Sequence, residues 1–138
     1  MSNFEMAEIN FQEQKEIQGI KYQDITYYKQ NGNEIVDYED MIHIDFIKAM
    51  SEMENLNWKL FNHIGFRNHK TGDFVQFIRQ GKNKWYADVP INGGVNWGGY
   101  CWGAYGDNKT ISSTVRLFFE EVEWFGGLLN WKMRRFEH

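Results

Sequence analysis

Cys101 is the residue of this chain whose type most directly suggests chemistry, because a thiolate is a strong nucleophile. A cysteine nucleophile works with a histidine base and a carboxylate that orients the base, and His43, His63 and Asp107 are present. No recognisable catalytic signature surrounds Cys101, which lies between two aromatic residues. A lone cysteine in such a setting is typically a small buried apolar side chain. The sequence therefore predicts no catalytic residue and an unreactive thiol at this position.

The histidines and carboxylates have no spacing that favours a metal site. His63 and His69 are separated by a predicted turn, so nothing fixes their geometry relative to each other or to His43. We interpret all three as surface or capping residues, and the glutamates of positions 120–123 as a solvated helix face. A single cysteine excludes an intramolecular disulfide and a multi-cysteine zinc site. We therefore expect no metal and no cofactor.

The segment from Gly94 to Asp107 alternates large aromatic side chains with very small residues. As an extended strand it places Trp97 and Tyr105 on one face. Tyr100 and Trp102 then lie on the other face. We expect the first face to be covered by a helix and the second to meet a ligand or partner, although a bulge among the glycines would exchange the two faces. The glycine pairs match neither of the common phosphate-binding patterns.

Residues of the preceding predicted strands extend this aromatic face with polar groups. We expect Arg79, Tyr86 and Asp88 on the side of the sheet opposite the Trp85 face. Aromatic walls with a few polar groups are typical of a binding pocket. The alternative is that these residues are the ordinary outward side chains of an antiparallel sheet. The candidate binding residues are Tyr100, Trp102, Trp85, Tyr86, Arg79 and Asp88.

The elements that position these residues begin with a hairpin and a helix. Residues 1–10 are polar and are expected to be frayed. Positions 18–38 predict a hairpin, because the turn-forming residues 31–33 separate two runs of strand-forming residues. Positions 40–53 predict a helix with Asp40 as its N-cap, although the start of this segment also alternates as a strand would. The predicted apolar face of this helix comprises Ile42, Phe46, Ala49, Met50 and Met53.

The remainder of the chain predicts strands, a second helix and a closing strand. Positions 58–91 predict an antiparallel meander with polar turns at 68–73 and 81–83. Positions 112–125 predict a helix that a glycine pair ends, and positions 129–134 predict a strand whose charged outer face protects the sheet edge. The predicted core face of the first meander strand comprises Trp58, Leu60, Ile64 and Phe66. That of the second helix comprises Val115, Phe118, Phe119 and Val122.

This order of elements predicts one α+β domain over residues 1–138, with a mainly antiparallel sheet of about five to seven strands and two helices packed on it. The chain is long enough to bury a real core. Its six tryptophans, seven tyrosines and eleven phenylalanines make 17% of the residues aromatic. Such a surplus implies a very aromatic core, an aromatic-lined pocket or a self-association surface.

The net charge limits the classes of partner that we expect, and the absence of long apolar runs limits the expected location of the protein. A formal net charge of −4 argues against binding to nucleic acid or to an anionic membrane, both of which favour basic surfaces. We interpret the basic cluster of Lys132, Arg134 and Arg135 as a solvated sheet edge. No signal peptide and no apolar run of membrane-spanning length is present, so a cytoplasmic location is expected.

We therefore expect a non-enzymatic binding protein that uses an aromatic sheet face or pocket for a protein partner or for self-association. The expected self-associated form is a homodimer through the Tyr100–Trp102 face or a sheet edge. The alternative is a small-ligand-binding protein or enzyme with an aromatic-lined cavity, in which Arg79 or Asp88 supplies the polar chemistry. In size, acidity, tryptophan content and element order the chain resembles small bacterial accessory proteins, such as toxin-neutralising immunity proteins and mobile-cassette products, although no motif selects either.

Overall fold

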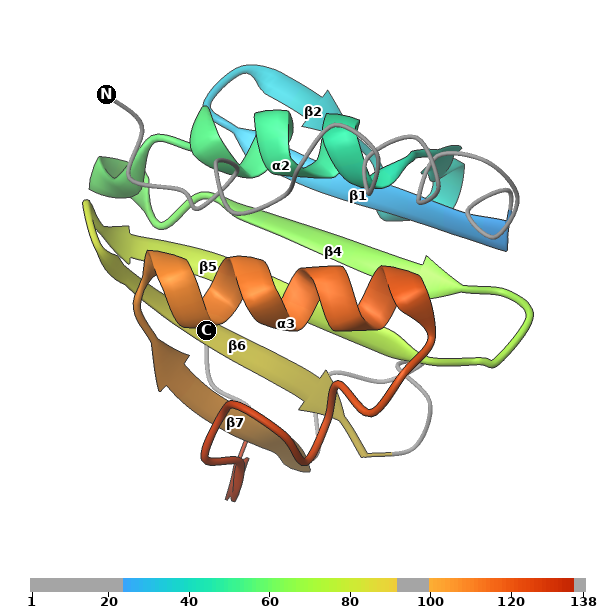
Figure 1. Ribbon diagram of the computed structural model, residues 1–138. Coiled ribbons are helices and arrows are strands. Elements are labelled where there is room, and N and C mark those ends of the chain that lie inside the picture. The colour runs from blue at the N-terminus through green and yellow to red at the C-terminus, as the bar shows by residue number, and fades with distance from the viewer. Residues whose placement is uncertain (1–23, 92–99, 136–138) are drawn as a thin grey trace.

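The computed structural model describes residues 24–91 and 100–135 and has the predicted α+β fold, with a single antiparallel sheet (Figure 1). The strands are β1 (Ile25–Asn31), β2 (Glu34–Val36), β3 (Ile42–His43), β4 (His63–Asn68), β5 (Phe74–Gly81), β6 (Lys84–Pro90), β7 (Tyr100–Gly106) and β8 (Lys132–Arg135). The helices are α2 (Phe46–Glu54) and α3 (Asn108–Glu120), with short 3-10 helices η3 (Tyr38–Asp40) and η4 (Trp58–Leu60). The expectations for residues 1–10 and for the start of the hairpin lie outside the described residues.

The sheet is largely a meander. Its strand order is β2-β1-β4-β5-β6-β7-β8, with β3 also pairing with β1, and the eight described strands exceed the predicted number. From β4 to β8 each strand pairs with the next strand along the chain. The predicted meander is therefore confirmed, and β8 lies at the sheet edge as expected of the closing strand. The β1–β2 hairpin is confirmed as well, with Gly32 at a φ of 63° that favours glycine.

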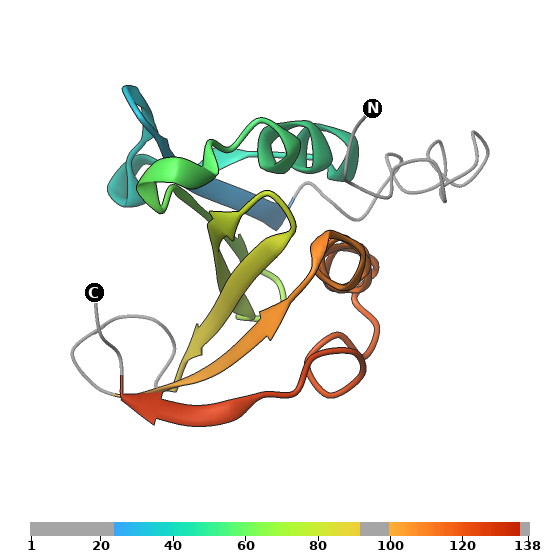
Figure 2. The ribbon, with the colours of Figure 1, turned by 90° about the vertical axis from the view of Figure 1, so that its left-hand side faces the viewer.

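Both helices lie on the same side of the sheet, and the sheet curls around α3 (Figure 2). The aromatic residues of the α3 core face were predicted correctly. The Phe66 ring on β4 lies 6.4 Å from that of Phe118 and 5.6 Å from that of Phe119, measured between centroids. The strand side chains fully buried beneath the helices are Ile25, Ile64, Phe66, Val75, Phe77, Trp85 and Ala87.

The first helix is shorter than predicted. Positions 42–43 form β3, and the N-cap is Asp45 rather than Asp40. The Oδ1 atom of Asp45 accepts a hydrogen bond from the backbone N–H of Lys48 at 2.8 Å. The residues before this cap therefore form a strand, as their alternation indicated, and not the first turn of the helix. Ile42, which was predicted on the apolar helix face, is 49% exposed. The other predicted core residues are buried, namely Phe46, Ala49, Met50 and Met53.

The second helix begins and ends earlier than predicted. Its N-cap is Asp107, whose Oδ1 atom accepts a hydrogen bond from the Thr110 N–H at 2.8 Å. It ends because Glu121 adopts a left-handed conformation with a φ of 59°. The N–H groups of Glu121 and Val122 then bond to carbonyls of the last helical turn. Val122 consequently lies outside the helix and is exposed, so its predicted place in the core is wrong.

The two faces of β7 are the reverse of the prediction. Trp102 is paired with Val89 on the helix side of the sheet, whereas Tyr105 is paired with Tyr86 on the opposite side. Tyr105 is half exposed, so its predicted place beneath a helix is wrong. Trp97, which the alternation placed on the same face as Tyr105, lies outside the described residues.

The start of the meander also differs from the prediction. Trp58 and Leu60 belong to η4, and the strand begins only at His63. A left-handed Phe61 between them interrupts the extended backbone that the alternation had implied. Of the four residues predicted on this core face, Ile64 and Phe66 are buried as expected, whereas Trp58 and Leu60 are exposed.

Candidate functional site

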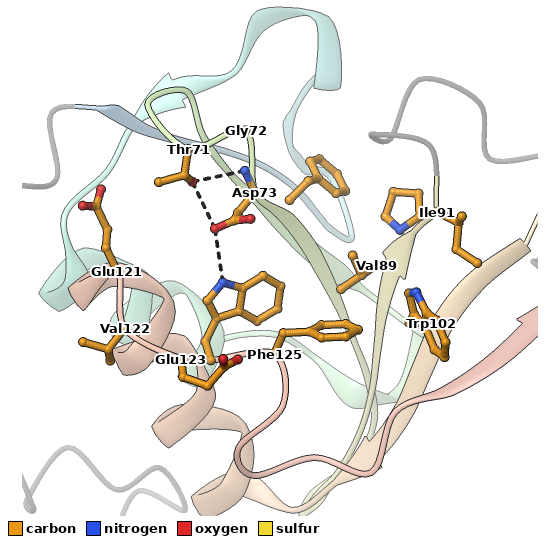
Figure 3. Close-up of a pocket in the computed structure, with 13 residues that line it drawn as sticks. Thr71, Gly72, Asp73, Val89, Ile91, Trp102, Glu121, Val122, Glu123 and Phe125 are labelled. Carbon is orange, nitrogen blue, oxygen red and sulfur yellow. Dashed lines mark hydrogen bonds between the residues drawn. The ribbon is translucent and has the colours of Figure 1, made fainter.

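An open pocket of about 600 Å³ lies at one end of the sheet (Figure 3). It forms where the β4–β5 turn, the end of β6, the start of β7 and the segment after α3 meet. Its volume is within the usual range for ligand pockets. The aromatic lining residues are Phe74, Trp102, Trp124 and Phe125, and the acidic ones are Asp73, Glu121 and Glu123. No basic side chain is among the described lining residues.

Aromatic rings form a preorganised wall of this pocket. The Trp124 ring meets Phe118 and Phe125 edge-on, at centroid distances of 5.1 and 5.7 Å. The Phe125 ring lies 6.0 Å from Trp102 and stacks on Trp131 at 5.0 Å. Each of these contacts holds a neighbouring ring in place, so the wall exists without a ligand.

Asp73 is tied to the aromatic wall by hydrogen bonds. Its Oδ2 atom accepts a hydrogen bond from the Trp124 indole N–H at 3.3 Å and one from the Thr71 hydroxyl at 3.0 Å (Figure 3). Both donors are neutral, so they orient the carboxylate without cancelling its charge. Glu123 similarly accepts a hydrogen bond from the backbone N–H of Gly126 at 3.0 Å.

Glu121 joins the pocket to the end of β4. Its carboxylate accepts a hydrogen bond from the Asn68 side-chain amide at 2.8 Å and lies 3.4 Å from the Lys70 ammonium. Lys70 offsets part of the charge of the three carboxylates, and the pocket rim stays negative. The arrangement suits an apolar ligand that carries a positive charge, because aromatic faces and carboxylates both attract cations.

The predicted binding residues divide among different places. Trp102 lines the pocket. Tyr100 is 60% exposed at the start of β7 and is not among the described lining residues. Trp85 is fully buried beneath α3, and its indole N–H donates a hydrogen bond to Oδ1 of Asn108 at 2.7 Å. Trp85 is therefore a core residue and does not reach a ligand.

Arg79 lies on the same side of the sheet as Trp85, contrary to the prediction. It is the cross-strand partner of Trp85, and the alternation of β5 turns it toward the helices. Its guanidinium stacks on the rings of Trp58 and Trp85 at 5.0 and 5.2 Å from their centroids. It also donates hydrogen bonds to the backbone carbonyls of Glu54, Leu56 and Lys82. These contacts give Arg79 a structural role.

Asp88 and Tyr86 do lie on the face opposite Trp85, as predicted. Asp88 is fully buried, and neither carboxylate oxygen has a hydrogen-bond partner of ordinary geometry. Burial raises the pKa of Asp88 from 3.8 to about 7, against a smaller lowering effect of the neighbouring Gln76. Gln76 in turn accepts a hydrogen bond from the Tyr28 hydroxyl. This polar cluster lies apart from the pocket, which none of its members lines.

Two glycines make room for the tyrosines of this cluster. A Cβ atom at Gly65 would overlap the ring of Tyr28, and a Cβ atom at Gly103 would overlap the hydroxyl end of Tyr86. Gly65 is the direct cross-strand partner of Tyr28, whereas Gly103 is paired with Asp88 and lies diagonally across from Tyr86 on the neighbouring strand. The close approach of the rings to the sheet therefore depends on the missing side chains.

Cys101 is buried next to the same cluster, which agrees with the predicted structural role. It is 1% exposed, and burial raises the pKa of its thiol. The nearby Asp88 carboxylate and the Tyr86 hydroxyl are the polar groups that influence it most. A buried thiol with a raised pKa holds little reactive thiolate at neutral pH.

We expect Cys101 to react slowly with an aromatic disulfide reagent in the native protein and rapidly once the chain is unfolded in urea. The native rate should be at least about tenfold below the unfolded rate, because exposure and thiolate fraction both fall on folding. Stopped-flow absorbance measures both rates. Rapid native labelling with a pH midpoint below that of a free thiol would contradict the structural role.

The described residues contain neither a metal-ligand cluster nor a membrane-spanning helix. Within positions 24–91 and 100–135, no three histidine, cysteine or acidic side chains gather as metal ligands would. Of the helices in this part of the chain, none combines the length and the apolar character needed to cross a membrane.

Comparisons with protein-family models, curated proteins and solved structures found no match to this chain.

The sequence interpretation missed most of the pocket. Most of its residues come from the β4–β5 turn and from segment 121–125, which are about 50 positions apart in the sequence. The sequence predicts a turn for the first segment and part of a helix for the second, and neither prediction indicates that they meet. The available signal was the adjacent Trp124 and Phe125 near the glycine pair. Two large aromatic residues next to a helix stop commonly pack back onto the fold, but the strand they would meet was not evident.

Proposed function

We propose that this chain is a non-enzymatic binding protein whose pocket receives an apolar, positively charged segment of a partner protein. The observation that carries the proposal is the combination of a preorganised aromatic wall with three carboxylates, Asp73, Glu121 and Glu123, in one open pocket. Apolar side chains entering the pocket gain from removal of aromatic and aliphatic surface from water. A cation on the same segment gains from the carboxylates and from the ring faces.

The acidic rim supports a protein partner with a basic group over a nucleic acid. Phosphates would be repelled by the same carboxylates that attract an ammonium or guanidinium. Tryptophan, as at Trp102 and Trp124, is among the residues most enriched at the energetic centres of interfaces. The single buried cysteine fits a reducing compartment, and a cytoplasmic location is part of the proposal.

The alternative of a small-ligand-binding protein or enzyme has less support. It relied on Arg79 and Asp88 as polar groups of one cavity, whereas neither is a described lining residue of the pocket. Arg79 is engaged by three backbone carbonyls on the helix side of the sheet. Asp88 lies on the other side of the sheet, so the two residues do not share a site.

The proposal is tested by NMR titration with a pair of short blocked peptides that share two leucines and differ in carrying lysines or glutamates. We expect the lysine peptide to shift the indole N–H signal of Trp124, which bonds to Asp73 in the pocket. The indole signal of Trp85 is an internal control, because its N–H bonds to Asn108 in the core. The glutamate peptide should bind at least about tenfold more weakly.

The variant Val122→Arg is the control that tests whether the peptide binds in this pocket. Val122 lies in the pocket lining and is 49% exposed, so a larger charged side chain there leaves the fold intact and obstructs the pocket. Its titration with the lysine peptide should leave the Trp124 signal unmoved. Equal shifts with both peptides, or shifts that survive in Val122→Arg, would refute the proposed pocket function.

A further inference from the structure

The loop of residues Trp58–Phe61, here called the hydrophobic loop, exposes three large apolar side chains in succession around one lysine. Trp58 is 37% exposed, Leu60 68% and Phe61 64%. Lys59 is exposed between them. Single exposed apolar residues are ordinary, but a contiguous group is typical of an interaction site.

An asparagine network holds the hydrophobic loop in one conformation. The Asn57 side chain accepts a hydrogen bond from the Lys59 N–H at 2.9 Å, and the Asn62 amide donates to the Asn57 carbonyl at 2.8 Å. Asn31 on the β1–β2 hairpin accepts hydrogen bonds from both the Asn57 N–H and the Asn62 amide. The Arg79 guanidinium also stacks on the Trp58 ring. A loop ordered in this way loses little freedom on binding.

Phe61 adopts a backbone conformation that an unconstrained phenylalanine avoids. Its φ of 52° and ψ of 40° lie in the left-handed region, which favours glycine. Its ring remains mostly in solvent, so the hydrogen bonds of Asn57 and Asn62 on either side, and not burial of the ring, hold the residue in this conformation. Strained residues that present an exposed side chain are concentrated at binding sites.

The hydrophobic loop precedes β4, and the β4–β5 turn that contributes to the pocket follows it, so the two lie at opposite ends of that strand (Figure 1). The pocket contains Phe74 at the start of β5, whereas the loop rests on Arg79 near the end of that strand. Five residues of extended strand separate these positions by about 17 Å. A molecule therefore cannot place its own loop in its own pocket, but it can offer the loop to a second molecule.

We propose that the hydrophobic loop of one copy docks into the pocket of another copy, an inference that rests on the proposed function of the pocket. The two surfaces are complementary in kind. The loop offers apolar side chains and the Lys59 ammonium, whereas the pocket offers an aromatic wall and the carboxylates of Asp73, Glu121 and Glu123. The loop is thus an apolar segment with a positive charge, which is the kind of segment that the pocket favours. Every copy of the protein carries one.

This contact is heterologous, because different surfaces of the two copies meet. A docked pair still has one free loop at one end and one free pocket at the other, so association continues head to tail into a short chain or a ring. A single loop in a pocket buries less area than a standard interface, and the association is therefore weak and reversible.

Sedimentation velocity across protein concentrations from about 10 µM to about 1 mM tests the proposal. For the unmodified protein, we expect the weight-average sedimentation coefficient to rise continuously past the dimer value. Phe61→Gly removes the ring and suits the left-handed backbone, so this variant should fold and remain monomeric. Val122→Arg obstructs the pocket and should also remain monomeric. Tyr100→Ser, at an exposed position outside the described lining, is the matched control and should associate normally.

Mixing the two monomeric variants gives the sharpest result. The Val122→Arg copy keeps a functional loop and the Phe61→Gly copy keeps a functional pocket, so the mixture should form a one-to-one dimer and nothing larger. A mixture that stays monomeric would overturn the loop-to-pocket contact. A dimer of the unmodified protein that does not grow, and that Tyr100→Ser abolishes, would instead indicate a two-fold interface at β7.

The failure of this inference is distinguishable from the failure of the proposed pocket function. An unmodified protein that is monomeric throughout the concentration range overturns self-docking. If the lysine peptide still shifts the Trp124 indole signal in that protein, the pocket binds a basic apolar segment of a different partner. If neither association nor peptide binding occurs, both proposals are wrong.

Discussion

Replacing Asp88 with asparagine is expected to stabilise the protein by up to about 4 kcal/mol at pH 8 and to change its stability little at pH 4. Burial raises the pKa of Asp88 from 3.8 to about 7. Between pH 3.8 and about pH 7, Asp88 is therefore protonated in the folded state and ionised in the unfolded state. In the unmodified protein this carboxyl makes stability fall as the pH rises through that window, which is the opposite of the usual behaviour of an aspartate.

Urea unfolding at a series of pH values from 4 to 8 measures this effect. The free energy of unfolding of Asp88→Asn should lack most of the decline that the unmodified protein shows across the window. Asp107→Asn is the control of opposite sign, because the Thr110 N–H lowers the pKa of the Asp107 carboxyl. The Asp107 contribution is present at neutral pH and is lost as the pH falls. Identical pH profiles for Asp88→Asn and the unmodified protein would show that Asp88 is not desolvated.

Truncating Phe118 to alanine is expected to cost about 3–5 kcal/mol of stability. The Phe118 ring is 2% exposed and packs between Phe66 on β4, Phe119 on the same helix and Trp124 of the pocket wall. Its removal leaves a cavity at the centre of the helix–sheet contact. Because Trp124 loses its neighbour, the pocket should also bind the lysine peptide more weakly in this variant.

Val122→Ala is the matched control for this core position. The two residues are four positions apart, and helical spacing alone would place them on the same face. In the structure Val122 follows the helix end and is half exposed, so its truncation should cost less than about 1 kcal/mol. Equal urea midpoints for the two variants would contradict the observed end of α3 at Glu120.

The fold was predictable because apolar periodicity reports directly which side chains are buried. Phe46, Met50, Phe118 and Phe119 were recognised from helical spacing, and the meander from alternating strands and polar turns. The helix ends were not predicted, because a single hydrogen bond or backbone angle decides them. Asp107 accepts a hydrogen bond from the Thr110 N–H, so α3 begins earlier than predicted. Glu121 adopts a left-handed backbone conformation, so α3 ends well before the glycine pair.

The candidate site was predictable only in part, because a pocket is a property of tertiary contacts. Trp102 was recognised from its aromatic strand, but the faces of that strand were exchanged. Alternation shows which residues share a face and does not show which face the helices cover. The rest of the pocket is formed by a turn and by the segment after α3, where neither strand nor helix periodicity applies.

The close packing of Tyr28 on Gly65 and of Tyr86 on Gly103 restricts how this sequence can change in evolution. Neither glycine can accept a larger residue in one step, since the incoming Cβ atom would displace a tyrosine ring from the face that holds Asp88. A smaller residue at the tyrosine would have to come first, and it would leave Asp88 more open to water. In any set of descendants we therefore expect each glycine and its tyrosine to be exchanged together, as two linked pairs of sequence positions.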